Sequence, residues 1–292
     1  MIIYYHNDLD GRCAAAIAWR SNLSDGRPIQ LKEVDYKDSI DLDEISPGET
    51  VLILDFSFKT AVMNLLLQRT GEVIWIDHHK TAIEDLKEFE SLKGYRISDK
   101  YSGCELTWMY FNPNQRLPLA AALIGDYDKW ALNYQPKCFE FYEGLKMENT
   151  CPQGELWTTL FSEDSSKSFA KINDILDQGQ IAIKYRDSYC SNLRKQFGYE
   201  ALLEKLPHFK IYACNMYLFG SKGFGELFAQ YDIVAAYIYD GYRFTVSFYS
   251  DGKVDVGTLC KQLFNGGGHS GAAGFVCKEL PFRRKELQDE MS

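Results

Sequence analysis

The sequence predicts an α/β protein with a mostly parallel sheet in its first third, a helical connector in the middle and a smaller mixed α/β domain at the end. Two observations carry this prediction. Short apolar runs alternate with helical spacing in the first third, and strand-like runs return after residue 207. Because strand-helix alternation is typical of parallel sheets with crossover connections, we expect domains at residues 1–135 and 207–292, joined by the connector at 136–206.

The first third contains three buried strands in this prediction: Ile2–Tyr5, Val51–Leu54 and Val73–Ile76. Each run is short and rich in β-branched or aromatic side chains, as strands covered on both faces are. Apolar residues at helical spacing follow the first run and separate the other two. These intervals therefore predict the helices that cross from one parallel strand to the next.

The rest of the chain predicts a long helix and then a second set of strands. Apolar residues at helical steps run from Phe169 to Phe197 along one face. Strands are expected at Lys210–Cys214, Ile233–Tyr239 and Phe244–Tyr249, the last two around the turn dipeptide Asp240-Gly241. A further helix from residue 256 ends at an asparagine followed by three glycines.

The composition excludes some classes of protein. The 292 residues are 46% hydrophobic and 25% charged, as in globular proteins, and the net charge is −9. A protein that coats long duplexes needs a strong positive field, so that class is disfavoured. The eight cysteines include no C-x-x-C pair, which indicates reduced thiols. No apolar run reaches the roughly 18 residues of a membrane span, and we expect a cytoplasmic protein.

Each of the three N-terminal strands is followed at once by a side chain that can bind a metal. His6 follows the first strand, Asp55 the second, and Asp77, His78 and His79 the third. The carboxyl ends of parallel strands share one edge, where α/β proteins bind ligands. Carboxylates gathered there repel one another unless cations neutralise them. The mixed set suits Mn²⁺ or a similar ion, and two ions sharing a carboxylate are usual in phosphate-ester hydrolysis.

Taken singly, these side chains also have ordinary structural explanations. His6 fits a strand-end histidine that is satisfied by neighbours. Asp8 and Asp10 fit turn formers or a helix cap, because a helix follows them, and Asp55 fits a cap of the next helix. Their joint occurrence at one sheet edge favours the metal site.

Asp126 is a further candidate ligand, because it shares a predicted helix face with core residues and buried acids are costly unless paired or metal-bound. The alternative is a solvated carboxylate beyond the end of the helix. Asp128 lies close by and ranks second.

Together these residues resemble the DHH phosphoesterase superfamily with its accompanying DHHA1 domain. The motifs that carry the resemblance stand in the family's order over nearly the whole chain: HNDLDG at 6–11, Asp55, Asp77-His78-His79, Gly125-Asp126 and GGGHSGAAG at 266–274. The resemblance implies a catalytic DHH domain at 1–135 and a substrate-binding DHHA1 domain at 207–292. It is greatest to short-oligoribonucleotide nucleases (nanoRNases) and related cyclic-nucleotide or cyclic-dinucleotide phosphodiesterases.

The resemblance also implies roles for the residues and a pair of Mn²⁺ ions, with Mg²⁺ or Co²⁺ as substitutes. His79 would donate a hydrogen bond to a phosphate or leaving oxygen, and Asp77 would orient a histidine or the loop. The metal ligands would be His6 and Asp8 for one ion, Asp10, His78 and Asp126 for the other, and Asp55 between them.

The glycine-rich motif would bind a phosphate of the substrate. Gly266, Gly267 and Gly268 would let backbone N–H groups approach it as an anion nest, and His269 would add a donor. A flexible stop after a helix is the alternative. Many family members carry Ser-x-Arg-Ser ahead of this motif, where this chain has Tyr249 in place of the arginine. That change puts a preference for terminal phosphates in doubt and favours base or sugar stacking.

We therefore expect a Mn²⁺-dependent phosphodiesterase that cuts short single-stranded RNA to 5′-mononucleotides. A two-domain cleft suits substrates of roughly two to five nucleotides. Alternative enzymes are a phosphodiesterase for cyclic nucleotides or linear dinucleotides, and a phosphatase for 3′-phosphoadenosine 5′-phosphate. The non-enzyme alternative is a nucleotide-sensing protein with a DHH fold. No long duplex and no membrane is expected as a partner.

Overall fold

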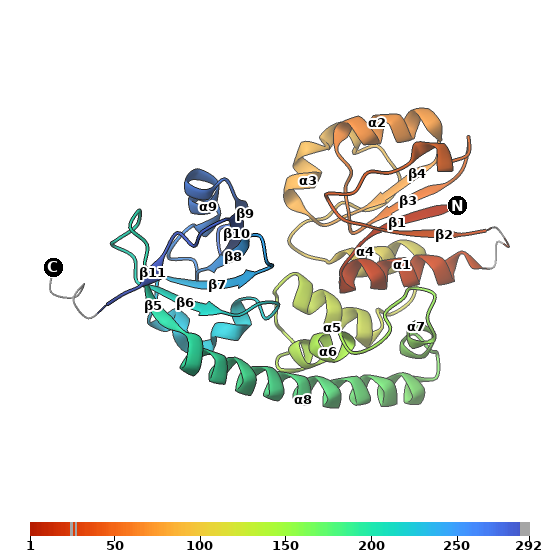
Figure 1. Ribbon diagram of the computed structural model, residues 1–292. Helices are drawn as coiled ribbons and strands as arrows, with labels where there is room; N and C mark the ends of the chain where they lie inside the picture. Colours follow the sequence, from red (N-terminus) through yellow and green to blue (C-terminus); the bar gives the residue numbers. More distant parts are fainter. Residues whose placement is uncertain (24–25, 27, 287–292) are drawn as a thin grey trace. The chain divides into compact units, whose positions relative to one another are not determined.

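The computed structural model describes residues 1–23, 26 and 28–286, which form two compact units, Met1–Ala182 and Ile183–Ser292 (Figure 1). The division falls inside one long helix, α8 (Ser165–Phe197), which contributes to both units. The predicted fold class is confirmed, because the first unit contains a parallel sheet and the second a mixed one. The functional division at 135/136 and 206/207 stays a prediction.

The first unit is built on a four-stranded parallel sheet with the order β2-β1-β3-β4. Its strands are β1 (Ile2–His6), β2 (Gln30–Val34), β3 (Val51–Leu54) and β4 (Val73–Ile76). The three predicted strands are confirmed with nearly the predicted bounds. The edge strand β2 was missed, because its sequence QLKEV is mostly polar and only its last residue is buried.

Helices cover both faces of this sheet (Figure 1). Alternate strand residues point to opposite faces, so Ile3 and Leu52 join one core cluster and Ile2 and Ile53 another. On the first side lie α1 (Leu9–Ser21), α4 (Gly103–Phe111), α5 (Leu119–Asp128), α6 (Lys137–Leu145), α7 (Glu155–Leu160) and the start of α8. On the second lie α2 (Thr60–Arg69) and the turn η3 (Lys87–Phe89), with η2 (Leu42–Glu44) beside them and α3 (Lys80–Asp85) after β4.

Burial on both faces stabilises the sheet that carries the site. Ile3, Leu52, Ile53 and Leu54 have no solvent-exposed surface. Each fully buried side chain of this size contributes about 1.5–3 kcal/mol relative to an exposed one. The strand ends are therefore held on a rigid support.

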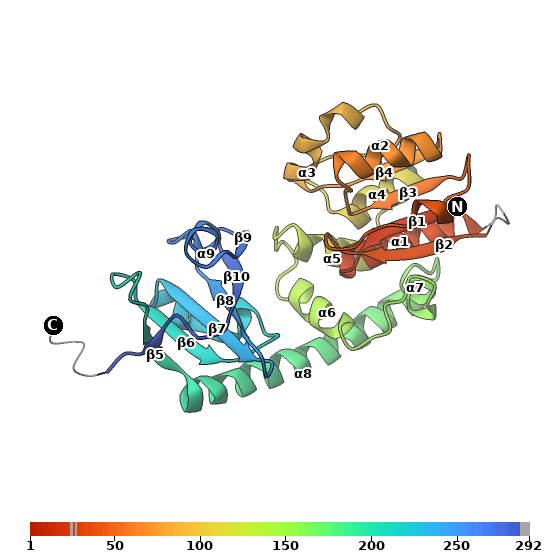
Figure 2. The same ribbon diagram turned by 45° about the horizontal axis from the view of Figure 1, so that its top comes forward.

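The second unit contains a seven-stranded sheet with the order β11-β5-β6-β7-β8-β10-β9. The strands are β5 (Tyr199–Leu202), β6 (Ile211–Asn215), β7 (Ile233–Tyr239), β8 (Phe244–Tyr249), β9 (Gly267–His269), β10 (Ala272–Cys277) and β11 (Arg283–Arg284). Helix α9 (Val256–Phe264) packs in one core cluster, while η4 (Ser221–Ala229) and the end of α8 pack in another. In the ribbon, α9 and the end of α8 lie on opposite faces of this sheet (Figure 2). The three strands and the helix predicted for this region are confirmed.

Two further features bear on the class of protein. All eight cysteines are free thiols. Within residues 1–23, 26 and 28–286, no helix has both the length and the apolar character that a membrane span requires.

Candidate metal centre

The carboxyl edge of the parallel sheet gathers most of the predicted ligands. His6 is the last residue of β1, Asp55 follows β3, and the Asp77–His79 segment follows β4. Among the described residues, three sets of side chains have ligand atoms within 4.8 Å of one another: His6 with Asp8 and Asp55, Asp10 with His78 and Asp128, and Asp55 with His78 and His79. The predicted convergence of residues distant in sequence is therefore present in the structure.

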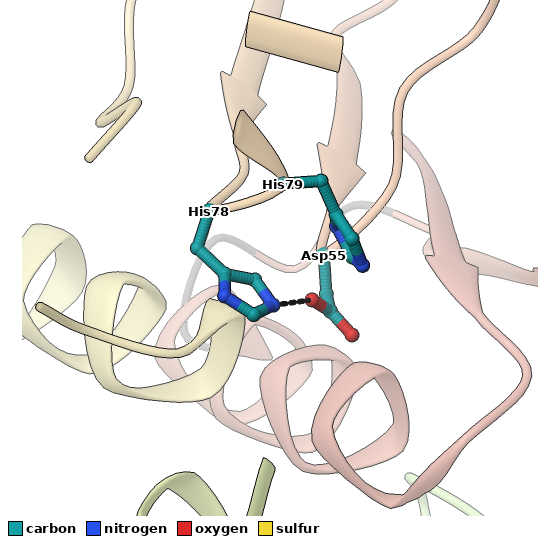
Figure 3. A group of neighbouring side chains, drawn as sticks. All are labelled: Asp55, His78 and His79. Carbon is teal, nitrogen blue, oxygen red and sulfur yellow. Dashed lines mark ion pairs between the residues drawn. The ribbon is translucent and has the colours of Figure 1, made fainter. Parts of the chain in front are cut away.

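Asp55 lies between the first two sets. Its Oδ1 is 3.2 Å from Nε2 of His78 (Figure 3). Its Oδ2 is 3.9 Å from Nδ1 of His6. The side chain is buried, and neither oxygen has a hydrogen-bond partner. Its backbone is left-handed, with φ of 53°, and its N–H donates to the carbonyl of Ile76. A Cβ on Gly103 would lie 2.4 Å from Cβ of Asp55, so only glycine fits there.

Asp8 acts as a helix cap and as part of the first set. It is the N-cap of α1, and its Oδ1 accepts a hydrogen bond from the N–H of Gly11. Its other oxygen lies 2.7 Å from Nδ1 of His6. A Cβ on Gly11 would lie 2.3 Å from the carbonyl oxygen of His6, so the turn that brings Asp8 to His6 requires glycine. The structural and the metal-binding explanations of Asp8 are compatible.

Asp10 is held at the N-terminus of α4. Its carboxylate accepts hydrogen bonds from the hydroxyl of Ser102 at 2.8 Å and from the N–H groups of Gly103 and Cys104 at 2.6 and 3.1 Å. A helix N-terminus favours negative charge, and Ser102 with Glu105 forms the capping box that starts this helix. Oδ2 of Asp10 is 3.9 Å from Nε2 of His78, so the acid is fixed beside the second set.

The structure does not bring the predicted ligand Asp126 to the cluster. Its oxygens accept hydrogen bonds from the N–H groups of Asn133 and Tyr134, each at 2.9 Å, in the loop after α5. Burial alone would raise the pKa of Asp126, but these N–H donors lower it. Asp128, two residues further along the chain, takes the expected place instead, with Oδ2 at 3.3 Å from Nε2 of His78. We therefore replace Asp126 with Asp128 in the candidate ligand set.

A sequence signal for Asp128 exists. It lies four residues after Ile124 and seven after Ala121, both fully buried. Of the residues that indicated the face of Asp126, Leu123 is buried, whereas Leu119 and Ala122 are partly buried. Asp126 is itself buried, as predicted, and hydrogen bonds from the loop after α5 satisfy it, so helical spacing alone does not choose between the two acids.

Asp77 and His79 form a pair beside the ligands. Asp77 is fully buried, and its Oδ1 lies 2.7 Å from Nδ1 of His79 and accepts from the N–H groups of His78 and His79. Its Oδ2 accepts from the hydroxyl of Ser57. Burial alone would lower the pKa of His79, but Asp77 raises it through the hydrogen bond and its charge. Asp77 thus fixes the ring so that Nε2 of His79 is left to meet a ligand.

The electrostatics of the cluster fit bound cations. Burial, followed by the charges of Asp10 and Asp8, raises the pKa of Asp55 well above its usual range and that of Asp128 to about 9. Four buried atoms among the described residues lack a hydrogen-bond partner, namely Nδ1 of His6, both oxygens of Asp55 and Oδ2 of Asp128. Buried polar atoms of native proteins are normally satisfied. Imidazole and carboxylate donors suit a first-row divalent ion, which would satisfy all four.

Metal-free protein should lose stability as the pH rises, and divalent ions should restore it. The pKa of Asp128 is raised from 3.8 to about 9 in the folded protein. Above pH 3.8 the unfolded chain loses this proton more readily than the folded one, so the stability that is fully present below pH 3.8 is lost as the pH rises through about 9. Thermal unfolding with chelator and with Mn²⁺ should therefore diverge progressively across this range. Calorimetry at neutral pH should detect net proton release on metal binding. A metal-induced stabilisation that does not change with pH would contradict this assignment.

The comparisons with known proteins agree with this geometry at the level of the fold. No family model matches the chain. An uncharacterized protein, R106 of Acanthamoeba polyphaga mimivirus, is 28% identical over 262 residues, which cover 83% of this chain and 57% of that protein. The chain thus spans a little over half the length of this relative.

Several solved structures resemble the chain over most of its length. The DHH domain of a member of a ribosomal-protein family has a TM-score of 0.59 at 14% identity, covering 94% of this chain and 82% of that one. A pGpG-specific phosphodiesterase, PggH of Vibrio cholerae, has a TM-score of 0.52 at 11% identity, covering 95% and 92%. RecJ of Thermus thermophilus with Mn²⁺ has a TM-score of 0.51 at 15% identity, covering 94% and 49%. At these identities the likeness establishes the fold.

Proposed function

The chain has the fold of the DHH superfamily, and on this premise we propose that it is a two-metal phosphodiesterase that hydrolyses short oligoribonucleotides to 5′-mononucleotides. The ligands would be His6, Asp8 and Asp55 for one ion and Asp10, His78 and Asp128 for the other, with Asp55 shared. Mn²⁺ is the proposed metal, with Mg²⁺ or Co²⁺ as substitutes.

The observation that carries this proposal is the placement of Asp55. Its two oxygens are buried, lack hydrogen bonds and face histidines of different ligand sets. A carboxylate with this environment and no cation would take up a proton. A pair of neighbouring divalent ions, which a shared carboxylate would hold together, is a usual arrangement for hydrolysing phosphate esters.

The chain's own groups have distinct tasks in this proposal. A bound pair of divalent ions polarises the phosphate and lowers the pKa of a water molecule. Protonated His79, held by Asp77, donates to a phosphate oxygen or to the leaving oxygen from Nε2. The hydrogen bond and charge of Asp77 raise the pKa of His79, which favours the protonated donor form relative to a free imidazole. Asp10 is fixed in position by its hydrogen bonds to the N-terminus of α4.

The glycine-rich segment of the second unit is proposed to bind a substrate phosphate. A Cβ on Gly266 would lie 2.2 Å from the carbonyl of Gly274, and Gly268 has φ of 145°, so both positions require glycine. Gly267 has open space around it, and β9 with His269 is exposed at the sheet edge. Exposed edge N–H groups and an imidazole are suitable donors to an anion.

A linear dinucleotide is the second candidate substrate. The observation that favours it is the fold of the pGpG-specific phosphodiesterase, which matches the chain over 95% of its length. Both candidate substrates are short, single-stranded and made of nucleotides. The chain's net charge of −9 disfavours long duplex partners, and both substrates are compatible with it. The cytoplasm is the proposed location.

A substrate panel in Mn²⁺ buffer tests the proposal. We expect RNA dimers to pentamers to be hydrolysed fastest, with 5′-mononucleotides as products and pyrophosphate hardly cleaved. Linear dinucleotides, cyclic nucleotides and 3′-phosphoadenosine 5′-phosphate complete the panel. Turnover confined to linear dinucleotides would select the second candidate. Tight binding of two ions without turnover of any member would instead indicate a nucleotide sensor.

A further inference from the structure

The strand missed by the sequence prediction brings an aromatic side chain to the metal centre. β2 pairs in parallel with β1, with Val34 opposite His6, so both strands end at the same sheet edge. Tyr36 follows β2 by two residues, and its ring centroid lies 5.6 Å from that of His6. The ring is therefore a neighbour of a proposed metal ligand.

Tyr36 is held in place although its side chain is exposed. The turn that carries it is closed by hydrogen bonds between Asp35 and Asp38 and by one from the N–H of Tyr36 to Oδ1 of Asp35. Its ring packs on Phe56 at 4.9 Å and 33°. Phe56 is 3% exposed, whereas Tyr36 is 55% exposed. A ring supported on one side by a buried phenylalanine presents its remaining surface to solvent.

A supported, exposed ring beside a phosphate-hydrolysing centre is suited to stacking. Nucleobases stack on aromatic side chains in any sequence context, because every base has a π-face. A tyrosine that only covered the core would bury most of its surface.

We propose that Tyr36 is a stacking platform for the nucleobase next to the scissile phosphate, and thereby selects nucleobase-bearing phosphodiesters. This inference rests on the proposed function and narrows its substrate class. It assigns the base of the bound nucleotide to the His6 side of the metal centre. Tyr36 is then a specificity-determining residue whose aromatic face, and not its hydroxyl group, is required.

The test compares wild type with Tyr36→Ala, Tyr36→Phe and the control Tyr242→Ala, which removes a tyrosine that is 89% exposed in the second unit. One assay measures kcat/KM in Mn²⁺ for diadenylate and for the same diester without bases. A second measures binding of AMP and of ribose 5-phosphate by calorimetry, which needs no turnover. We expect Tyr36→Ala to lower the ratio of kcat/KM for diadenylate to kcat/KM for the base-free diester roughly 5- to 150-fold, which is the range expected for the loss of one stacking contact. Tyr36→Phe and Tyr242→Ala should discriminate as wild type does.

Three outcomes would overturn the inference. Tyr36→Ala could weaken both substrates equally, which would indicate a structural role. Tyr36→Phe could lose as much of the preference for the base-bearing substrate as Tyr36→Ala does, which would indicate a role of the hydroxyl group. Wild type could bind AMP no better than ribose 5-phosphate. If wild type hydrolyses neither diester yet prefers AMP through Tyr36, the proposed function fails and the stacking site stands.

Discussion

Replacing Asp55 with asparagine should abolish phosphodiesterase turnover while the chain stays folded. Removing a group that only orients a metal ligand lowers metal affinity or activity by up to about 100-fold. Removing a ligand that two ions share should lower activity by more than that. Asparagine keeps the volume of the side chain and removes a buried carboxylate. Burial disfavours the charged form of this carboxylate. The metal-free variant should therefore be as stable as wild type or more so.

The measurement is kcat/KM in Mn²⁺ together with thermal unfolding in chelator. Asp177→Asn, on the exposed surface of α8, is the matched control and should behave as wild type in both assays. Activity of Asp55→Asn near the wild-type rate would show that the shared carboxylate does not carry the chemistry. A large loss of stability in chelator would show that Asp55 has a structural role.

Asp126→Asn and Asp128→Asn should separate folding from catalysis, although the two acids are two residues apart. Asp128 belongs to a candidate ligand set and lacks a hydrogen bond on Oδ2, so Asp128→Asn should lose activity by more than about 100-fold. Asp126 accepts from the backbone of Asn133 and Tyr134. Asp126→Asn should therefore lower the unfolding free energy by about 1–3 kcal/mol, the cost of an unsatisfied buried donor, with activity largely kept.

Unfolding in urea and Mn²⁺-dependent turnover of the two variants form the measurement. The reverse pattern, in which Asp126→Asn is inactive and Asp128→Asn is unstable but active, would restore the ligand set predicted from the sequence. That result would require the loop at 133–134 to release Asp126 when metal binds.

Much of the fold was predictable because both faces of the central strands are buried. Val51–Leu54 and Val73–Ile76 consist of apolar residues alone, and their bounds were predicted without error. β2 was missed because an edge strand with a solvent-exposed side needs few apolar residues. The position of Tyr36 follows from β2 and was missed with it.

The candidate site was predictable in its ligand types and less so in its details. Placement at the ends of parallel strands identified His6, Asp55 and His78, because topology alone brings those ends together. The choice between Asp126 and Asp128 depends on the loop after α5, where Trp130 and Leu132 have φ of 55°. Such left-handed residues are not readable from helical periodicity. Tertiary hydrogen bonds in this loop decide which acid turns towards His78.

The most direct test of the two-metal centre is a crystal structure of the chain with Mn²⁺, measured at the manganese absorption edge. Two anomalous peaks about 4 Å apart, with one oxygen of Asp55 next to each, are the predicted result. His6 and Asp8 should contact one peak, and Asp10, His78 and Asp128 the other. A single peak, or two peaks that Asp55 does not contact, would contradict the account.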